Sequence, residues 1–134
     1  MKKKILVVGS TYYKDSWMTL KDQVKILLEK NKFKNDWIKV PGVFEIPVVI
    51  SRNIKKYDGF IALGCVIKGE TPHFEFISKA SIDAIMKLSI DSKKPIGNGI
   101  ITCLNSDQAI VRSKTKGGEA AIAVIEVLKN DSKN

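Results

Sequence analysis

Short apolar segments alternate with helical patterns along this chain, and this alternation restricts the possible folds more than any other feature. Residues 3–9, 60–65 and 96–103 are runs rich in apolar residues and glycine, which is typical of strands buried on both faces of a sheet. Segment 37–40 is a further candidate strand, and it ends at a Pro-Gly pair. Strands separated by helices form parallel sheets with right-handed crossovers. The pattern therefore predicts a flavodoxin-like three-layer α/β/α sandwich with a four-stranded parallel sheet.

Helical patterns fill most of the intervening sequence. Apolar spacing and capping residues predict five helices: Asp15 or Ser16 to about Lys30, Val43 to about Lys55, Pro72 to beyond Leu88, Asn105 to Val111, and Ala120 to Leu128. We expect Asp15 or Ser16 to cap the first helix. We expect Thr71 to cap the third, with Pro72 at its first helical position. The basic segment 112–118, which ends in two glycines, is predicted to be a loop.

The length of 134 residues favours a single domain covering residues 1–134. No apolar run approaches the roughly 20 residues that a membrane span needs. The apolar run after the first lysines is too short for a signal peptide. We therefore expect a cytoplasmic protein with no membrane partner. In that compartment Cys65 and Cys103 imply neither a disulfide nor a metal site.

The formal net charge of +9 comes mostly from lysine. Such a balance is compatible with nucleic-acid binding. The lysines are nevertheless spread along the chain among acidic residues, and no base-recognition motif accompanies them. A solvated basic surface is therefore favoured over a nucleic-acid-binding module, and the charge also favours anionic substrates.

The segments that follow the predicted strands carry the residues best suited to chemistry. In an open parallel sheet these segments meet at one edge, where α/β proteins bind ligands. They include Tyr12 and Tyr13 after the first strand, Val43 to Glu45 after the second, and Gly64 to His73 after the third. The fourth strand is followed by Asn105. This convergence predicts a binding site at that edge.

Several residues in these segments have two possible roles. His73 is the only histidine and suits proton transfer near neutral pH, although an isolated histidine is more often structural. The helix start at Thr71 can bind an anion or simply be capped. Tyr12 and Phe44 are either core aromatics or stacking surfaces for a planar ring. Glu45 either complements a helix dipole or accepts hydrogen bonds from a ligand.

Charged residues outside these positions also have two possible roles. Glu70 is expected to face solvent unless a substrate binds it. Arg112 and Lys116 form either a solvated basic turn or a phosphate-binding pair. Segment 9–11 lacks the spacing of dinucleotide or nucleotide-triphosphate motifs. A phosphoacceptor receiver is also disfavoured, because the expected acidic residues after the first and third strands are replaced by uncharged ones.

Two segments, Pro41–Pro47 and Gly64–Phe74, resemble signature sequences of the 6,7-dimethyl-8-ribityllumazine synthase family. Segments 98–102 and 108–121 resemble the family's remaining conserved blocks, so the similarity covers nearly the whole chain in the same order. The resemblance implies a transferase of riboflavin biosynthesis. Its substrates would be 5-amino-6-(D-ribitylamino)uracil and 3,4-dihydroxy-2-butanone 4-phosphate, with no metal and no bound cofactor.

The resemblance also implies roles for particular residues. On the side of the pyrimidine and its ribityl chain it places seven of them: Tyr12, Val43, Phe44, Glu45, Cys65, Val66 and Ile67. On the side of the phosphorylated substrate it places Glu70, Thr71, Arg112 and Lys116, with His73 as the proton shuttle. Asn98 stands where many members have an aromatic residue beside the pyrimidine.

Members of this family form pentamers, or multiples of pentamers, with active sites shared between neighbours. The resemblance therefore implies self-association. A flavin- or lumazine-binding protein of the same fold that lacks turnover is the alternative function.

Overall fold

Four parallel strands form the central layer of the computed structural model, which describes residues 3–70 and 72–131. The strands are β1 (Lys4–Ser10), β2 (Lys34–Val40), β3 (Gly59–Ile67) and β4 (Ile96–Cys103). Their order across the sheet is β2-β1-β3-β4. The predicted strands are confirmed, with β2 beginning three residues before the predicted start at residue 37.

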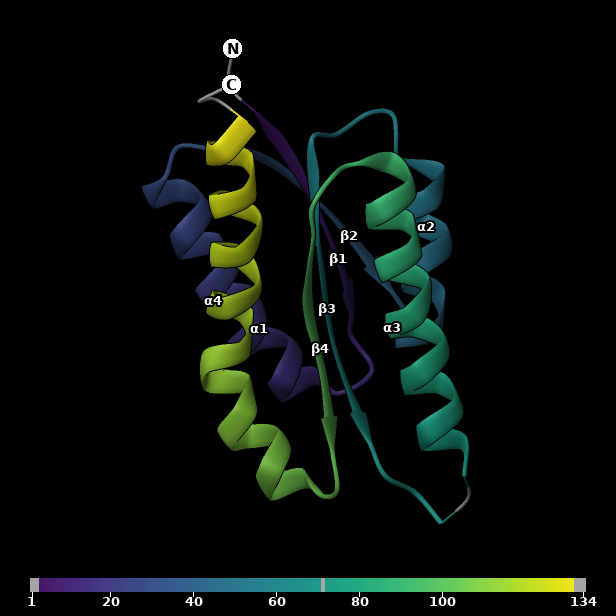
Figure 1. Ribbon diagram of the computed structural model, residues 1–134. Helices are drawn as coiled ribbons and strands as arrows, with labels where there is room; N and C mark the ends of the chain where they lie inside the picture. The colour runs from purple at the N-terminus through teal and green to yellow at the C-terminus, as the bar shows by residue number, and fades with distance from the viewer. Residues whose placement is uncertain (1–2, 71, 132–134) are drawn as a thin grey trace.

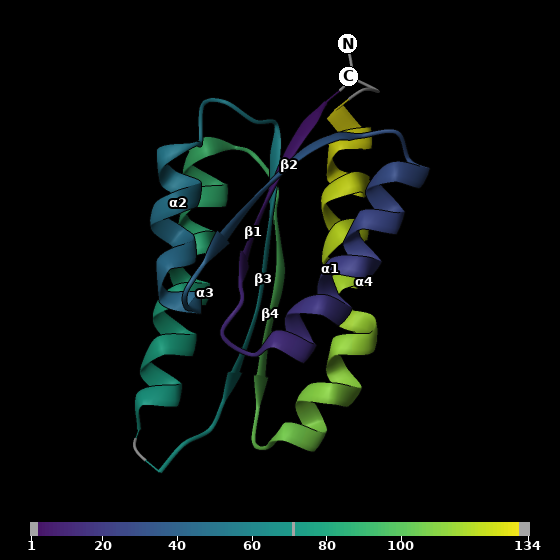
Figure 2. The same cartoon turned by 180° about the vertical axis from the view of Figure 1, so that it is seen from behind.

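Helices cover both faces of this sheet, as Figures 1 and 2 show. They are α1 (Lys14–Lys30), the short 3₁₀ helix η1 (Val43–Glu45), α2 (Ile46–Arg52), α3 (His73–Ser92) and α4 (Ser106–Asp131). Helices α1 and α4 lie on one face, and α2 and α3 lie on the other. The flavodoxin-like α/β/α arrangement is thereby confirmed. Across the described parts of the chain, every helix lacks the combination of length and apolarity needed to cross a bilayer.

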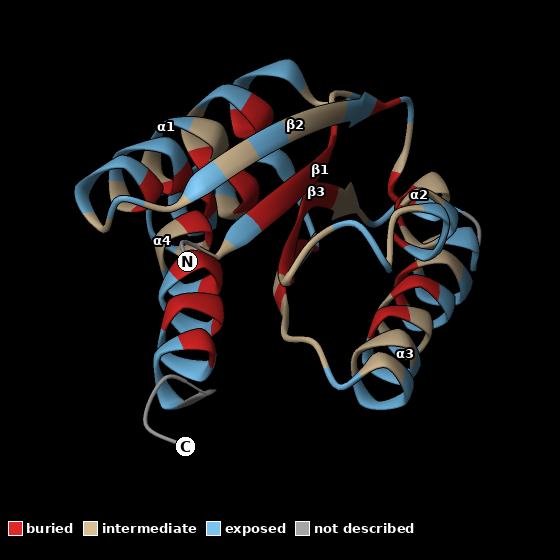
Figure 3. Cartoon of the chain, turned by 90° about the horizontal axis from the view of Figure 1, so that it is seen from above, coloured by how far each residue is buried: buried red, intermediate tan, exposed pale blue. Residues whose placement is uncertain are grey.

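The core consists of two apolar layers separated by the sheet. On β1, Ile5 and Val7 pack with α1 and α4, whereas Leu6 and Val8 pack with the α2 and α3 side. All four side chains are fully buried. Figure 3 shows the buried residues concentrated along β1, β3 and the inner helix faces. A strand buried on both faces has no polar positions, which explains the continuous apolar runs in the sequence.

Helix α4 corrects the prediction for the end of the chain. Segment 112–118, predicted as a loop, lies inside one continuous helix, Ser106–Asp131. This helix also contains both predicted short helices except for Asn105. Gly117 lies where α4 packs closely on α1, and a Cβ there would come within 2.7 Å of the Leu20 carbonyl oxygen. The glycine therefore permits a close helix contact rather than a turn.

The helix starts also differ from the predictions. Asp15 and Ser16 lie within α1, whose N-cap residue is Tyr13 and has no side-chain capping bond. At α3 the N-cap residue is Pro72 and the first helical residue is His73. The predicted cap, Thr71, lies outside the described residues. Helix α2 ends at Arg52 instead of continuing to Lys55.

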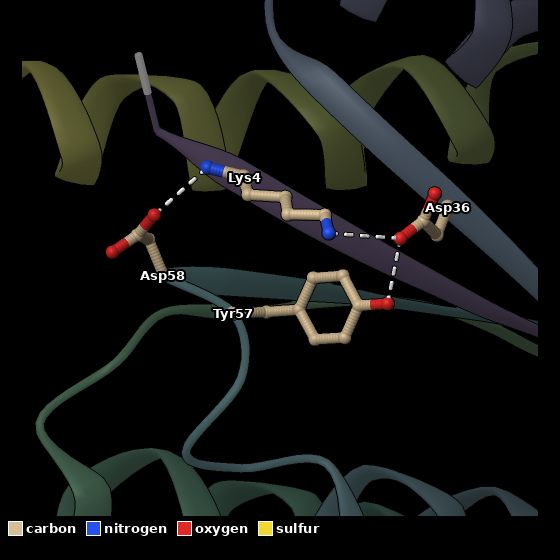
Figure 4. A network of polar contacts seen from close by, with 4 residues as sticks. All are labelled: Lys4, Asp36, Tyr57 and Asp58. Atoms are coloured by element: carbon tan, nitrogen blue, oxygen red, sulfur yellow. Dashed lines mark hydrogen bonds and ion pairs between the residues drawn. The ribbon is translucent and has the colours of Figure 1, made fainter. Parts of the chain in front are cut away.

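A polar network joins the amino-terminal ends of the strands (Figure 4). The Lys4 ammonium lies 3.3 Å from Asp36 Oδ2, and the Tyr57 hydroxyl donates to the same oxygen at 2.7 Å. The Lys4 backbone N–H donates to Asp58 Oδ2 at 2.8 Å. These contacts connect β1, β2 and the turn before β3 at the end of the sheet opposite the predicted site.

Candidate active site

A cavity of about 520 Å³ lies at the carboxyl ends of β1 and β3, beside η1 and the start of α3. We call it the His73 cavity. Its lining residues come from four separate segments: Ser10, Tyr12, Tyr13, Gly42, Val43, Phe44, Glu45, Cys65, Val66, Ile67, Gly69, His73, Phe74 and Ile77. Eight of the sequence-predicted site residues therefore lie together: Tyr12, Val43, Phe44, Glu45, Cys65, Val66, Ile67 and His73.

The end of β1 is tied to the end of β2 by the buried Ser10. Its hydroxyl donates to the Pro41 carbonyl oxygen at 3.3 Å and accepts from the Tyr12 N–H at 3.4 Å. Tyr12 is 74% exposed and meets Tyr13 edge to face, with ring centroids 4.9 Å apart. Tyr12 is therefore not a core aromatic, and its ring is accessible from the cavity.

Helix η1 forms the second wall through a reciprocal pair of hydrogen bonds. The Gly42 N–H donates to Glu45 Oε1 at 2.9 Å, and the Glu45 N–H donates to the Gly42 carbonyl oxygen at 3.2 Å. Phe44 is 59% exposed, so it too lies outside the core. The capping bond occupies one carboxylate oxygen of Glu45 and leaves the other for a ligand.

Strand β3 approaches η1 closely because residue 64 is glycine. A Cβ on Gly64 would lie only 2.6 Å from Val43 Cγ2 and 3.3 Å from Ser10 Cβ. Val43 is itself buried. The absence of a side chain at residue 64 thus sets the distance between two walls of the cavity.

The third wall contains Cys65, which is free and buried. Burial raises the pKa of its thiol to about 11, although a hydrogen bond with Ser16 acts in the opposite direction. The thiol is therefore neutral near pH 7 and a poor nucleophile. Val66 and Ile67 are half-buried beside it. This segment shapes the cavity and supplies no reactive side chain.

Helix α3 presents its first residue, His73, to the cavity. The N–H groups of Glu75 and Phe76 donate to the Pro72 carbonyl oxygen at 3.1 and 3.4 Å and secure the start of the helix. His73 is exposed. The imidazole therefore lies at the mouth of the cavity, where a proton donor or acceptor can reach both a ligand and solvent.

A second cavity, of about 350 Å³, lies at the outer edge of β4 between α3 and α4. We call it the Arg112 cavity. It contains three of the predicted residues, Asn98, Arg112 and Lys116, and its described lining has no residue in common with that of the His73 cavity. The Arg112 guanidinium donates to the Thr102 carbonyl oxygen at 3.0 Å. Asn98 Oδ1 accepts from the Ile100 N–H at 3.0 Å.

One further predicted residue, Glu70, lies near the start of α3. Glu70 lines a small hollow of about 170 Å³ that shares Gly69 and Phe74 with the His73 cavity. Thr71 lies outside the described residues.

Six lining residues were not among the predicted site residues: Ser10, Tyr13, Gly42, Gly69, Phe74 and Ile77. Ile77 lies one helical turn after His73, so helical spacing alone places it on the same face. Tyr13 follows the first strand and has a raised pKa because it is partly buried, with Tyr12 and Cys65 nearby. Ser10 carries no signal in the sequence that distinguishes it from other polar residues at strand ends.

A parallel sheet with a ligand-sized cavity at the carboxyl ends of its strands defines an α/β protein that binds a small molecule at that edge. The chain belongs to the 6,7-dimethyl-8-ribityllumazine synthase family, whose family model matches residues 2–131. The predicted resemblance is confirmed. The protein is an enzyme of riboflavin biosynthesis, a transferase.

Individual relatives agree with this assignment. The 6,7-dimethyl-8-ribityllumazine synthase of Bartonella tribocorum is 42% identical, and the match covers 100% of this chain and 97% of the relative. The protein of the same name from Agrobacterium fabrum is 40% identical over 96% of this chain and 94% of its own length. Among solved structures, an ABC domain from Streptococcus pneumonia in complex with L-Trp is similar with a TM-score of 0.51. It is 20% identical, and the match covers 95% of this chain and 40% of that one. This last similarity shows the fold alone.

Proposed function

We propose that this enzyme condenses 5-amino-6-(D-ribitylamino)uracil with 3,4-dihydroxy-2-butanone 4-phosphate, releasing phosphate and water, in the penultimate step of riboflavin biosynthesis. The observation that carries the proposal is the His73 cavity. In this cavity, residues that follow three strands lie around one histidine, and the chain belongs to the lumazine synthase family. The reaction requires an amine to attack a carbonyl, a phosphate to leave and a ring to close. Proximity and proton transfer supply most of the catalysis.

In this proposal the His73 cavity holds the pyrimidine and its ribityl chain. Tyr12 and Phe44 offer exposed aromatic faces for the planar ring. The free carboxylate oxygen of Glu45 accepts hydrogen bonds from the ligand, while Cys65, Val66 and Ile67 form the wall mainly through their backbone. His73 transfers protons at the mouth of the cavity.

The phosphorylated substrate requires positive charge that the His73 cavity does not provide. Its described lining contains Glu45 but neither Lys nor Arg. The Arg112 cavity has the opposite character, because it contains both Arg112 and Lys116. A guanidinium and an ammonium are the usual partners of a phosphate ester. A complete site therefore needs both cavities.

We propose that the two cavities are joined in a homopentamer, or in a multiple of pentamers, in which one subunit's Asn98, Arg112 and Lys116 face the neighbouring subunit's His73 cavity. Glu70 and Thr71 would then border the phosphorylated substrate. The exposed apolar residues of α3, which include Phe76 and Ile90, support association, because exposed apolar surface marks contact sites. Further parts of the proposal are a single domain spanning residues 1–134, a cytoplasmic location, no cofactor and no nucleic-acid partner.

Two measurements test this function. The purified protein, supplied with both substrates, should form the lumazine product, which is followed by its absorbance. Light scattering should give a particle mass of five subunits or a multiple of five. A protein that binds the product yet forms none from the substrates would overturn the enzymatic proposal, and a monomer with full activity would overturn the shared site.

A further inference from the structure

The side chain of Gln23 links α1 to the backbone of α4 at two points. Its Nε2 donates to the Ser113 carbonyl oxygen at 2.5 Å, and its Oε1 accepts from the Gly118 N–H at 2.9 Å. A carbonyl can only accept and an N–H can only donate, so these two partners fix the orientation of the amide. Both polar ends of Gln23 are therefore committed to α4.

The contacts at this link are of the kind that bend a helix. In a regular helix the Gly118 N–H would donate to the carbonyl four residues earlier, and the bond to Gln23 competes with that arrangement. The buried Ser113 hydroxyl also donates to the Ala109 carbonyl oxygen at 2.6 Å, a contact that bends helices. Kinks occur at glycines and where a side chain enters the helical ladder. Figures 1 and 2 show that α4 changes direction partway along its length.

The bend is held against a rigid support. Gly117 contacts the backbone of α1 so closely that a Cβ would lie 2.7 Å from the Leu20 carbonyl oxygen. Leu20 and Val24, on either side of Gln23 along α1, are fully buried in the core. Gln23 thus connects the bent segment of α4 to a part of α1 that is fixed to the sheet.

The segment held in this way carries the cationic residues of the Arg112 cavity. Lys116 lies between the two residues that Gln23 contacts, and Arg112 directly precedes the first of them. The spacing of four residues places Arg112 and Lys116 on the same helix face, one turn apart. Both line the Arg112 cavity. The direction of α4 at its bend therefore determines where the two cations lie.

We propose that Gln23 is a positioning residue for the anion-binding part of the active site. By holding the bend in α4, it places the Arg112 guanidinium and the Lys116 ammonium where they meet the phosphate group of the substrate. Gln23 itself contacts no substrate in this arrangement. The inference rests on the proposed function, which assigns Arg112 and Lys116 to the phosphorylated substrate.

The test replaces Gln23 with Met, which has a similar length and no hydrogen-bonding amide. The dissociation constant for inorganic phosphate, measured by calorimetry, should rise about tenfold, because displacements of about 1 Å in a binding group have effects up to 10²-fold. The KM for the phosphorylated butanone should rise similarly, while the KM for the ribitylaminouracil stays within about twofold. Gln23→Asn, which is shorter by one methylene, should retain the fold and show a smaller phosphate effect.

Val24→Ala is the matched control. It removes buried volume from the adjacent position of α1 and lowers stability without removing a bond to α4, so its phosphate affinity should equal that of the wild type. The inference is overturned if Gln23→Met binds phosphate like the wild type, if Val24→Ala weakens phosphate equally, or if the wild type binds no phosphate. A wild type whose phosphate affinity depends on Gln23 but that forms no lumazine would overturn the proposed function and leave the positioning role supported.

Discussion

Replacing Gly64 with alanine should damage both stability and catalysis, because the new methyl group has no room. Its carbon would lie 2.6 Å from Val43 Cγ2, whereas carbon atoms normally approach to roughly 3.5–4.0 Å. Gly64 does not have a positive φ angle, so the effect is steric rather than conformational. Relief requires η1 to move from β3 by about 1 Å. Overpacking of this kind costs about 1–3 kcal/mol of unfolding free energy.

The same displacement carries Phe44 and Glu45 with it, so the cavity wall moves relative to His73. A shift of about 1 Å in a substrate-positioning group lowers kcat/KM by up to about 10²-fold. Urea unfolding at a fixed protein concentration and steady-state assays would measure the two effects. Gly69→Ala is the steric control for stability, because a Cβ there meets no described atom within 4 Å. Normal stability and normal kcat/KM in Gly64→Ala would refute the argument that this contact sets the cavity.

Three further predictions concern single side chains. His73→Ala should slow turnover by roughly 10²–10⁴-fold, the usual effect of losing one general acid–base group, and an unchanged steady-state rate would contradict this role. Cys65 should resist alkylation by iodoacetamide at neutral pH and react faster as the pH approaches its pKa of about 11; rapid labelling near pH 7, detected by mass spectrometry, would show that the thiol is not shielded. Tyr57→Phe should lower the free energy of unfolding at pH 7 by at most about 1 kcal/mol, because Asp36 is exposed to solvent. The hydrogen bond from Tyr57, followed by that from Lys4, lowers the pKa of Asp36 below 3.8, so this stabilisation is present above that pH and is lost as the pH falls through the lowered value. The difference between Tyr57→Phe and the wild type should accordingly shrink as the pH falls below 3.8, and a difference that grows there would contradict the assignment.

The accuracy of each strand prediction follows how far the residues of that strand are buried. β4 was predicted with its observed bounds, Ile96–Cys103, since its residues are mostly apolar or glycine. β2 is an edge strand with exposed and half-buried residues, and its first three residues, Lys34 to Asp36, are polar. Apolar runs identify strands covered on both faces, so the polar and partly exposed beginning of β2 escapes this criterion.

Helix α4 was not predictable from local sequence. Gly117 and Gly118 normally favour a turn, and their effect on a helix depends on what lies beside them. Here the neighbour is α1, and the N–H of Gly118 donates to a residue 95 positions earlier in the chain. The Asp15 and Ser16 cap failed for a related reason, because Ser16 is buried inside α1 beside Cys65 and does not face the helix end.

The candidate site was also predictable only in part. Residues that follow β1, β2 and β3 were predicted to meet, because parallel strands end at a common edge, and the His73 cavity is located there. Arg112 and Lys116 were assigned to a basic loop. Their actual position on a long helix beside β4 follows from the packing of α4 on α1, which the spacing of residues in one segment does not specify.

In the proposed oligomer, a neighbouring subunit would contact the outer edge of β4. An edge strand presents unpaired N–H and C=O groups that can extend a sheet into another chain. Here the Ile100 N–H donates to Asn98 Oδ1, and the Thr102 carbonyl accepts from Arg112. Two side chains of the proposed site therefore occupy backbone groups of the same edge strand. A neighbour that docks there meets side chains instead of a free strand edge, so the contact would complete a binding site without lengthening the sheet.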